Sequence, residues 1–68
     1  MYINSNNEEI EPKTLETTHL INALAKCYRE IFNSKDMKEF EKYSNNIMVL
    51  RNELDKRISN FADNIEVE

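Results

Sequence analysis

An apolar stripe runs through the second half of the chain and is its clearest pattern. Its members recur at steps of three or four residues: Phe40, Tyr43, Ile47, Leu50, Leu54, Ile58 and Phe61. Residues three and four apart lie on one face of an α-helix. The stripe therefore predicts an amphipathic helix over 36–62. Asp36 is its expected N-cap, because Glu39 follows three residues later at the spacing of a capping box.

A second, shorter stripe lies upstream. Its apolar members are Leu20, Ile21, Leu24, Cys27, Tyr28, Ile31 and Phe32. They predict a first helix over 13–33, and Pro12 suits its first turn because proline has no N–H to leave unbonded there. Thr14 is an alternative N-cap. The sequence Asn-Ser-Lys-Asp at 33–36 interrupts the pattern with turn-forming residues, so the two helices are separate.

Two helices joined by a short turn fold back on each other. The sequence therefore predicts an all-α chain whose body, residues 12–62, is an antiparallel two-helix hairpin. Residues 1–11 lack a helical period and carry acidic side chains without basic ones, which predicts a flexible acidic arm. Residues 63–68 are likewise acidic and are expected to form a C-terminal tail. The inter-helix core is expected from Leu24, Ile31, Ile47, Leu50 and Leu54.

The two expected helices differ in length. At about 1.5 Å per residue the first spans roughly 28 Å and the second roughly 40 Å. Ile58 and Phe61 thus project past the start of the first helix, where either the N-terminal arm or another chain covers them. A chain of 68 residues also has a marginal core of its own. We therefore expect a homodimer that forms a helical bundle, or a hairpin that presents an apolar face to a target.

Composition excludes several classes of function. A single cysteine, Cys27, forms no internal disulfide, and no Cys/His cluster offers a metal site, so no metal or cofactor of its own is expected. The chain has no glycine for a phosphate-binding loop and no basic patch for nucleic acid or an anionic membrane surface. No apolar run approaches the roughly 20 residues of a membrane span. The unpaired cysteine and the lack of a signal peptide predict a cytoplasmic location.

One polar stretch, residues 52–57, is a candidate site and has two interpretations. In the first it is the charged outer face of the helix, with Leu54 pointing inward. In the second, Asn52, Glu53 and Asp55 face a partner. An amide and a carboxylate can position a water molecule for attack on a phosphoryl group.

The segment 47–61 resembles the signature helix of the small sporulation-type aspartyl-phosphate phosphatases of Bacillus. Those proteins are two-helix hairpins that dephosphorylate the response regulator committing the cell to sporulation. This chain keeps the Val-Leu lead, the Glu-Leu-Asp at 53–55, and the Lys, Ile and aromatic residue that follow. Arg51 and Asn52 stand where the signature has Ser and Gln, and the turn lacks the family's glycine and is longer.

The resemblance implies that the second helix docks on a response-regulator receiver domain and promotes loss of its aspartyl phosphate. Asp55, Asn52 and Glu53 take the catalytic positions in this interpretation. The receiver supplies the phosphorylated aspartate and the Mg²⁺, so the chain needs no metal site of its own. The residues then expected to contact the partner are Arg51, Arg57, Ile58 and Phe61.

An alternative stays open beside the phosphatase. The chain is then a non-enzymatic helical interaction module or inhibitor, bacterial or phage, that dimerises as a coiled coil or blocks a larger protein. Arg51 in place of the signature Ser favours this interpretation.

Overall fold

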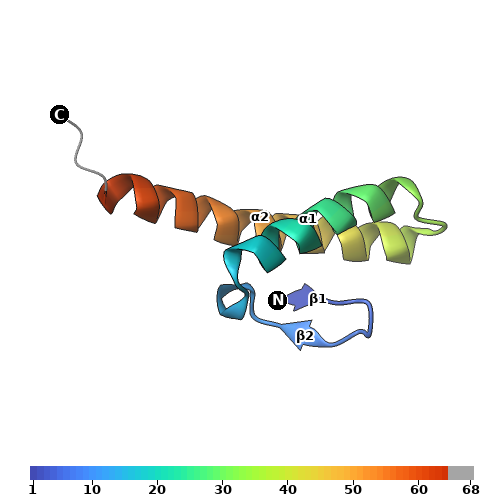
Figure 1. The fold of residues 1–68 in the computed structure, drawn as a ribbon. Helices are drawn as coiled ribbons and strands as arrows, with labels where there is room; N and C mark the ends of the chain where they lie inside the picture. The colour runs from blue at the N-terminus through green and yellow to red at the C-terminus, as the bar shows by residue number, and fades with distance from the viewer. Residues whose placement is uncertain (65–68) are drawn as a thin grey trace.

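The computed structural model describes residues 1–64 and is mostly helical (Figure 1). It contains two short strands, β1 and β2, a 3₁₀-helix, η1, and two α-helices, α1 and α2. Their bounds are Tyr2–Ile3, Glu9–Ile10, Pro12–Thr14, Thr17–Phe32 and Met37–Asn64. The chain is therefore largely all-α, as the sequence predicts, with one antiparallel strand pair as the exception.

The first helix begins later than expected. Pro12 starts η1 instead of α1, and Leu15 adopts an extended backbone (φ −83°, ψ 142°) that separates the two helices. The Thr14 hydroxyl donates to the carbonyl of Glu11 at 2.7 Å, so it does not cap α1. The helix starts only at Thr17, with Glu16 in the N-cap position.

Local side-chain bonds define the turn between the helices. The Asp36 carboxylate accepts the Glu39 N–H at 2.9 Å, which confirms Asp36 as the N-cap of α2. The other half of the capping box differs, because the Glu39 carboxylate accepts the N–H of Lys35 at 3.4 Å. At the end of α1 the Ser34 hydroxyl donates to the carbonyl of Ile31 at 2.9 Å, so a side chain satisfies one of the helix's last free carbonyls.

The end of α2 lies beyond the predicted boundary. The helix continues to Asn64 and so includes the first two residues of the expected acidic tail. Residues 65–68 of that tail lie outside the described residues. Figure 1 shows the last turns of α2 extending past the start of α1. Neither helix in the described part of the chain is long and apolar enough to cross a membrane.

The core is small and lies between α1 and α2. Leu20 and Leu50 are fully buried at its centre, and Ala23 and Cys27 complete it. The burial of Leu50 confirms the prediction that this residue of the long stripe lies in the core. The other expected core residues are only half-buried: Leu24, Ile31, Ile47 and Leu54. The centre of the core therefore lies one turn closer to the start of α1 than predicted.

The N-terminal segment, expected as a flexible arm without secondary structure, forms a small β-hairpin. In the strand pair Tyr2 lies opposite Ile10 and Ile3 lies opposite Glu9. The Asn4 side chain closes the loop by accepting the N–H groups of Asn6 and Glu8, both at 2.9 Å. Short polar side chains that bond nearby backbone N–H groups stabilise such a loop.

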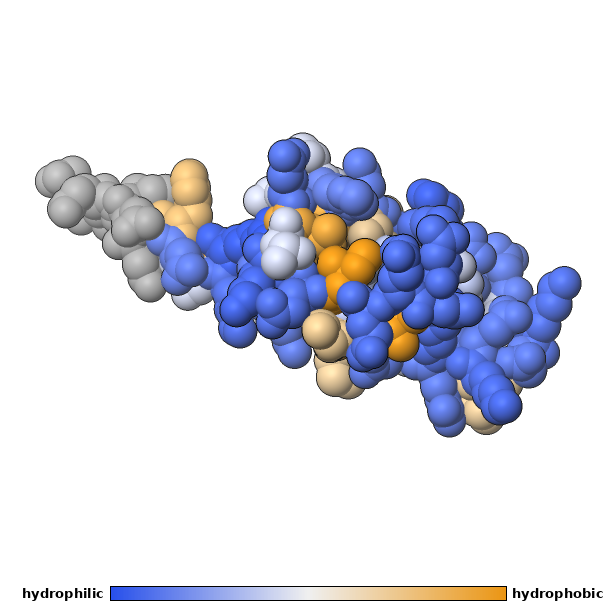
Figure 2. All heavy atoms as spheres, turned by 90° about the horizontal axis from the view of Figure 1, so that it is seen from below, coloured by the Kyte–Doolittle hydropathy of each residue, from blue (hydrophilic) through white to orange (hydrophobic). Residues whose placement is uncertain are grey.

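The strand pair covers one side of the two helices. Figure 2 views the molecule from the side on which β1 and β2 lie in Figure 1. Most of this face is hydrophilic, with a small hydrophobic group near its middle. Large apolar side chains are nevertheless exposed on both helices, among them Ile21, Tyr28, Phe40, Met48, Ile58 and Phe61.

Candidate functional site

Some side chains in the polar stretch of α2 are exposed, and others are half-buried. Asn52 and Asp55 are exposed, and they share one face of the helix because they are three residues apart. Glu53 and Arg57 are half-buried and lie four residues apart on a different face. The structure therefore brings together two of the three predicted catalytic residues at the surface.

Glu53 is committed to an internal ion pair. The Arg57 Nε donates to the Glu53 carboxylate at 2.9 Å, and the two side chains are only 21% and 16% exposed. The predicted role of Glu53 requires a carboxylate that faces a partner. In this structure the carboxylate instead orients Arg57.

Arg57 holds the segment that precedes α1. Its Nη2 donates to the carbonyl oxygens of Leu15 at 2.6 Å and Pro12 at 3.2 Å. Its Nη1 donates to the Thr17 hydroxyl at 3.1 Å. A guanidinium has five donors in one plane, and here most of them are used inside the molecule. Arg57, predicted to contact a partner, therefore joins η1 and the start of α1 to α2.

The other residues predicted to contact a partner are exposed. Arg51 lies on the surface, and the Ile58 and Phe61 side chains are 57% and 68% exposed. Arg51 and Asp55 are four residues apart, yet no ion pair joins them in the described part of the chain. A groove beside Arg51 is lined by Ile31, Ser44, Ile47, Met48, Arg51 and Asn52. The groove brings apolar and polar side chains of α2 together with Ile31 of α1.

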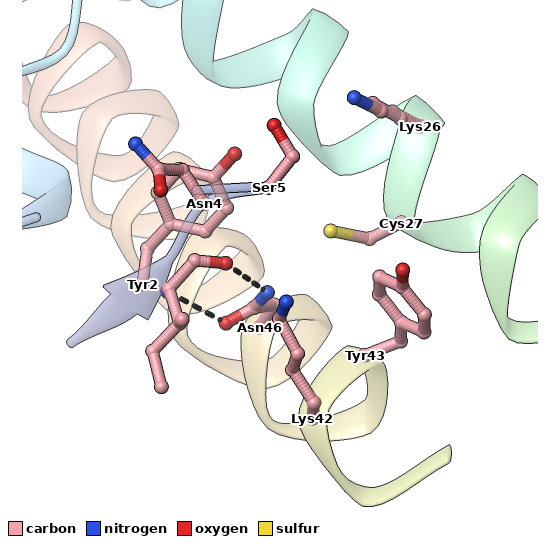
Figure 3. Close-up of a pocket in the computed structure, with 9 residues that line it drawn as sticks. Tyr2, Asn4, Ser5, Lys26, Cys27, Lys42, Tyr43 and Asn46 are labelled. Atoms are coloured by element: carbon pink, nitrogen blue, oxygen red, sulfur yellow. Dashed lines mark hydrogen bonds between the residues drawn. The ribbon is translucent and has the colours of Figure 1, made fainter. Parts of the chain in front are cut away.

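Asn46 anchors β1 to α2 and was not foreseen as an important residue. It is 1% exposed. Its Oδ1 accepts the Ile3 N–H at 2.9 Å, and its Nδ2 donates to the Ile3 carbonyl at 2.7 Å (Figure 3). The side-chain amide thus pairs both backbone groups of Ile3 as a neighbouring strand does. A polar residue between Tyr43 and Leu50 on the apolar stripe was the available signal.

Cys27 lies beside this anchor under the N-terminal strand. Figure 3 shows its side chain near Tyr43 and Asn46, at a pocket that Tyr2 and Lys42 also line. The pocket is small, with a volume of about 30 Å³, which is room for about one water molecule. Burial raises the pKa of the Cys27 thiol, so the sulfur stays protonated and is a poor nucleophile.

The described residues contain no group of three or more His, Cys, Asp or Glu side chains arranged to hold a metal ion. Comparisons of the chain with protein-family models, with characterised proteins and with solved structures found no match.

Proposed function

We propose that this chain is a small regulatory protein that acts by binding a partner protein through α2. The observation that carries the proposal is the exposure of large apolar side chains on this helix, with Met48, Ile58 and Phe61 each more than half exposed. Apolar surface costs about 25 cal/mol per Å² when it stays in water. Grouped apolar side chains on a protein surface mark sites of protein interaction.

In this proposal the body is an antiparallel two-helix hairpin that dimerises. The bond from Arg57 near the end of α2 to Thr17 at the start of α1 supports the antiparallel arrangement. The N-terminal hairpin packs on α2 through Asn46 and leaves Ile58 and Phe61 exposed. A second chain is then the remaining means of covering both side chains.

The proposed partner in the leading interpretation is the receiver domain of a response regulator, and the activity is aspartyl-phosphate phosphatase. Asn52 and Asp55 support it, because they place an amide and a carboxylate side by side on an accessible helix face. The receiver supplies the phosphorylated aspartate and the Mg²⁺. Glu53 acts in this version only through Arg57, since the two are paired.

A non-enzymatic interaction module is the second candidate. Internal bonds of Glu53 and Arg57 favour it, because they leave fewer polar groups on α2 available for chemistry. Arg51 favours it as well, since a long cation stands where the resembling family has a small hydroxyl. In this version the exposed face of α2 binds and blocks a larger protein.

Phosphate release from a phosphorylated sporulation receiver separates the two candidates. Asp55→Ala is expected to abolish release and leave the fold intact, because the residue is exposed and makes no ion pair in the described chain. Removing a carboxylate that positions water lowers transition-state stabilisation and not folding stability. Asn52→Ala should reduce release less, and Lys56→Ala, an exposed neighbour, is the control. Absence of release by the unaltered protein selects the interaction module.

A further inference from the structure

A second regular stripe lies on α2, beside the stripe that faces the core. Its residues recur at steps of 4, 3, 4, 3 and 4, and we call them the α2 seam: Ser44, Met48, Arg51, Asp55, Ile58 and Ala62. Ser44 is half-buried and the other five are exposed. Alternating steps of three and four place residues along the line where one helix faces another in a coiled coil.

The α2 seam is complementary to itself when it is read in the opposite direction. Its two ends are small, Ser44 and Ala62, and each is followed inward by an apolar residue, Met48 or Ile58. Its centre holds one cation and one anion, Arg51 and Asp55. Two copies related by a two-fold axis near residue 53 therefore pair small with small, apolar with apolar, and positive with negative. Such self-complementarity is what a two-fold interface requires.

The residues beside the α2 seam support the same pairing. One flank is apolar, with Ile47, Leu54 and Phe61 at steps of seven, and the other flank is polar, with Asn45, Asn52 and Ser59. In an antiparallel helix pair each flank meets the same flank of the other copy. Leu54 then meets Leu54, and Ile47 meets Phe61.

The apolar flank also decides where the rest of each copy lies. Ile47 and Leu54 pack against the core beneath α1. Both copies of α1 are therefore on the same side of the helix pair, and the result is a four-helix bundle. The end of each α2 that extends past its own α1 then lies on the body of the other copy. This arrangement covers Ile58 and Phe61, the residues that the hairpin leaves exposed.

The central charges select the antiparallel direction. Arg51 and Asp55 form no ion pair with each other in the described part of the chain, and a cation that precedes an anion by four residues is the weaker order on a helix. Both charges are therefore available to a second copy. A parallel pair would place Arg51 beside Arg51 and Asp55 beside Asp55, and like charges across an interface are repulsive.

We propose that the α2 seam binds the α2 seam of a second copy, antiparallel, through two symmetric Arg51–Asp55 ion pairs and two Met48–Ile58 contacts. The proposal deepens the suggested dimerisation and rests on the proposed action of the chain through α2. Asp55 is held in an ion pair within the dimer, so dimer formation and docking of a receiver compete for the same residue.

Charge reversal tests the pairing with sedimentation equilibrium as the readout. Arg51→Asp and Asp55→Arg are each expected to raise the dimer dissociation constant about tenfold or more, because each variant faces its own copy with like charges. An equimolar mixture of the two variants should dimerise again, since each supplies the charge that the other lacks. Lys56→Glu is the matched control, because it reverses an exposed charge beside the seam and should leave the dissociation constant unchanged.

Disulfide trapping supplies a second readout. A mixture of Ser44→Cys and Ala62→Cys chains should cross-link between the two variants under oxidation, and neither variant should cross-link with itself. Self-linking of Ser44→Cys, dimerisation of both charge variants at the level of the unaltered protein, or an unaltered protein that is monomeric at millimolar concentration would each overturn the proposal. None of these experiments uses a receiver domain, so a negative result in the phosphatase assay would not contradict the pairing of the α2 seam.

Discussion

The two sides of α2 differ in whether their polar side chains are bonded inside the molecule or exposed to solvent. On the side that faces β1 and η1, Asn46 bonds both backbone groups of Ile3, and Arg57 bonds the carbonyls before α1. On the far side, Arg51 and Asp55 are exposed and make no ion pair in the described chain. Met48 and Ile58 lie among them with more than half of their surface in water.

This difference separates the residues that hold the fold from those that are free to act. A buried polar group stabilises a structure only when it is hydrogen-bonded, and both polar atoms of the Asn46 side chain are. Exposed charges contribute little to stability, typically under about 1 kcal/mol. Substitutions on the strand-facing side should therefore reduce stability, whereas substitutions on the far side should change association or activity.

Loss of the core leucine is expected to have the largest effect. Leu50 is fully buried, and Leu50→Ala should lower the free energy of unfolding by about 2–5 kcal/mol, since it removes buried methyl groups and leaves a cavity. Met48→Ala, on the exposed side, should cost under about 0.5 kcal/mol when the chain is studied as a monomer. Urea denaturation followed by circular dichroism measures both. Equal losses would remove the distinction between the two sides.

Removal of the strand anchor should have the next largest effect. Asn46→Ala leaves the N–H and carbonyl of Ile3 without their partner, and an unsatisfied buried group costs about 1–3 kcal/mol. The Ile3 amide proton should also exchange faster with solvent. Asn45→Ala is the control, because Asn45 is exposed. Unchanged exchange at Ile3 would show that the N-terminal hairpin does not depend on Asn46.

Replacement of Arg57 tests the same side at its other end. Arg57→Lys keeps the charge, but a compact ammonium with three donors cannot reach all the acceptors that the planar guanidinium bonds, among them the Glu53 carboxylate and the Leu15 carbonyl. We expect a loss of about 1–2 kcal/mol in the free energy of unfolding, less than for Asn46→Ala because the Arg57 side chain is 21% exposed. Arg51→Lys, on the far side, should leave urea denaturation of the monomer unchanged. If Arg57→Lys leaves the free energy of unfolding unchanged, only the ion pair of Arg57 with Glu53 stabilises the chain, and its bonds to the backbone carbonyls do not.

Sequence alone predicts the local features of this fold and misses the distant ones. Asp36 and Glu39 are three residues apart, so the spacing reveals the cap. The stripe through Leu50 reveals a buried helix face for the same reason. The bond from Arg57 to Leu15 spans 42 residues and ends on a backbone carbonyl, which every residue type has. No residue pattern marks such a contact.

The same distinction between local and distant contacts applies to the candidate site. Asn52 and Asp55 were expected at the surface from their helix positions, and they are exposed there. Glu53 and Arg57 are four residues apart, and their burial depends on η1 packing beside them. The sequence pattern places that segment in the first helix, which leaves the side chains of Glu53 and Arg57 in solvent. Asn46 was detectable as the polar interruption of an apolar stripe.

Alkaline pH should produce the smallest effect and should act on the strand-facing side alone. Burial raises the pKa of the Cys27 thiol, so the folded chain keeps a proton that the unfolded chain releases first as the pH rises. The contribution of Cys27 to the free energy of unfolding is therefore fully present below the ordinary thiol pKa, about 8.5. It falls as the pH rises toward the higher pKa of the folded chain. Cys27→Ala should lower stability at every pH but flatten this fall, whereas Asp55→Asn should leave the slope unchanged. Urea midpoints between about pH 7 and pH 11 measure the slopes. Parallel curves for the unaltered and Cys27→Ala chains, with a fall only above about pH 10, would assign the fall to Tyr2 and Tyr43, whose pKa values are raised by burial as well.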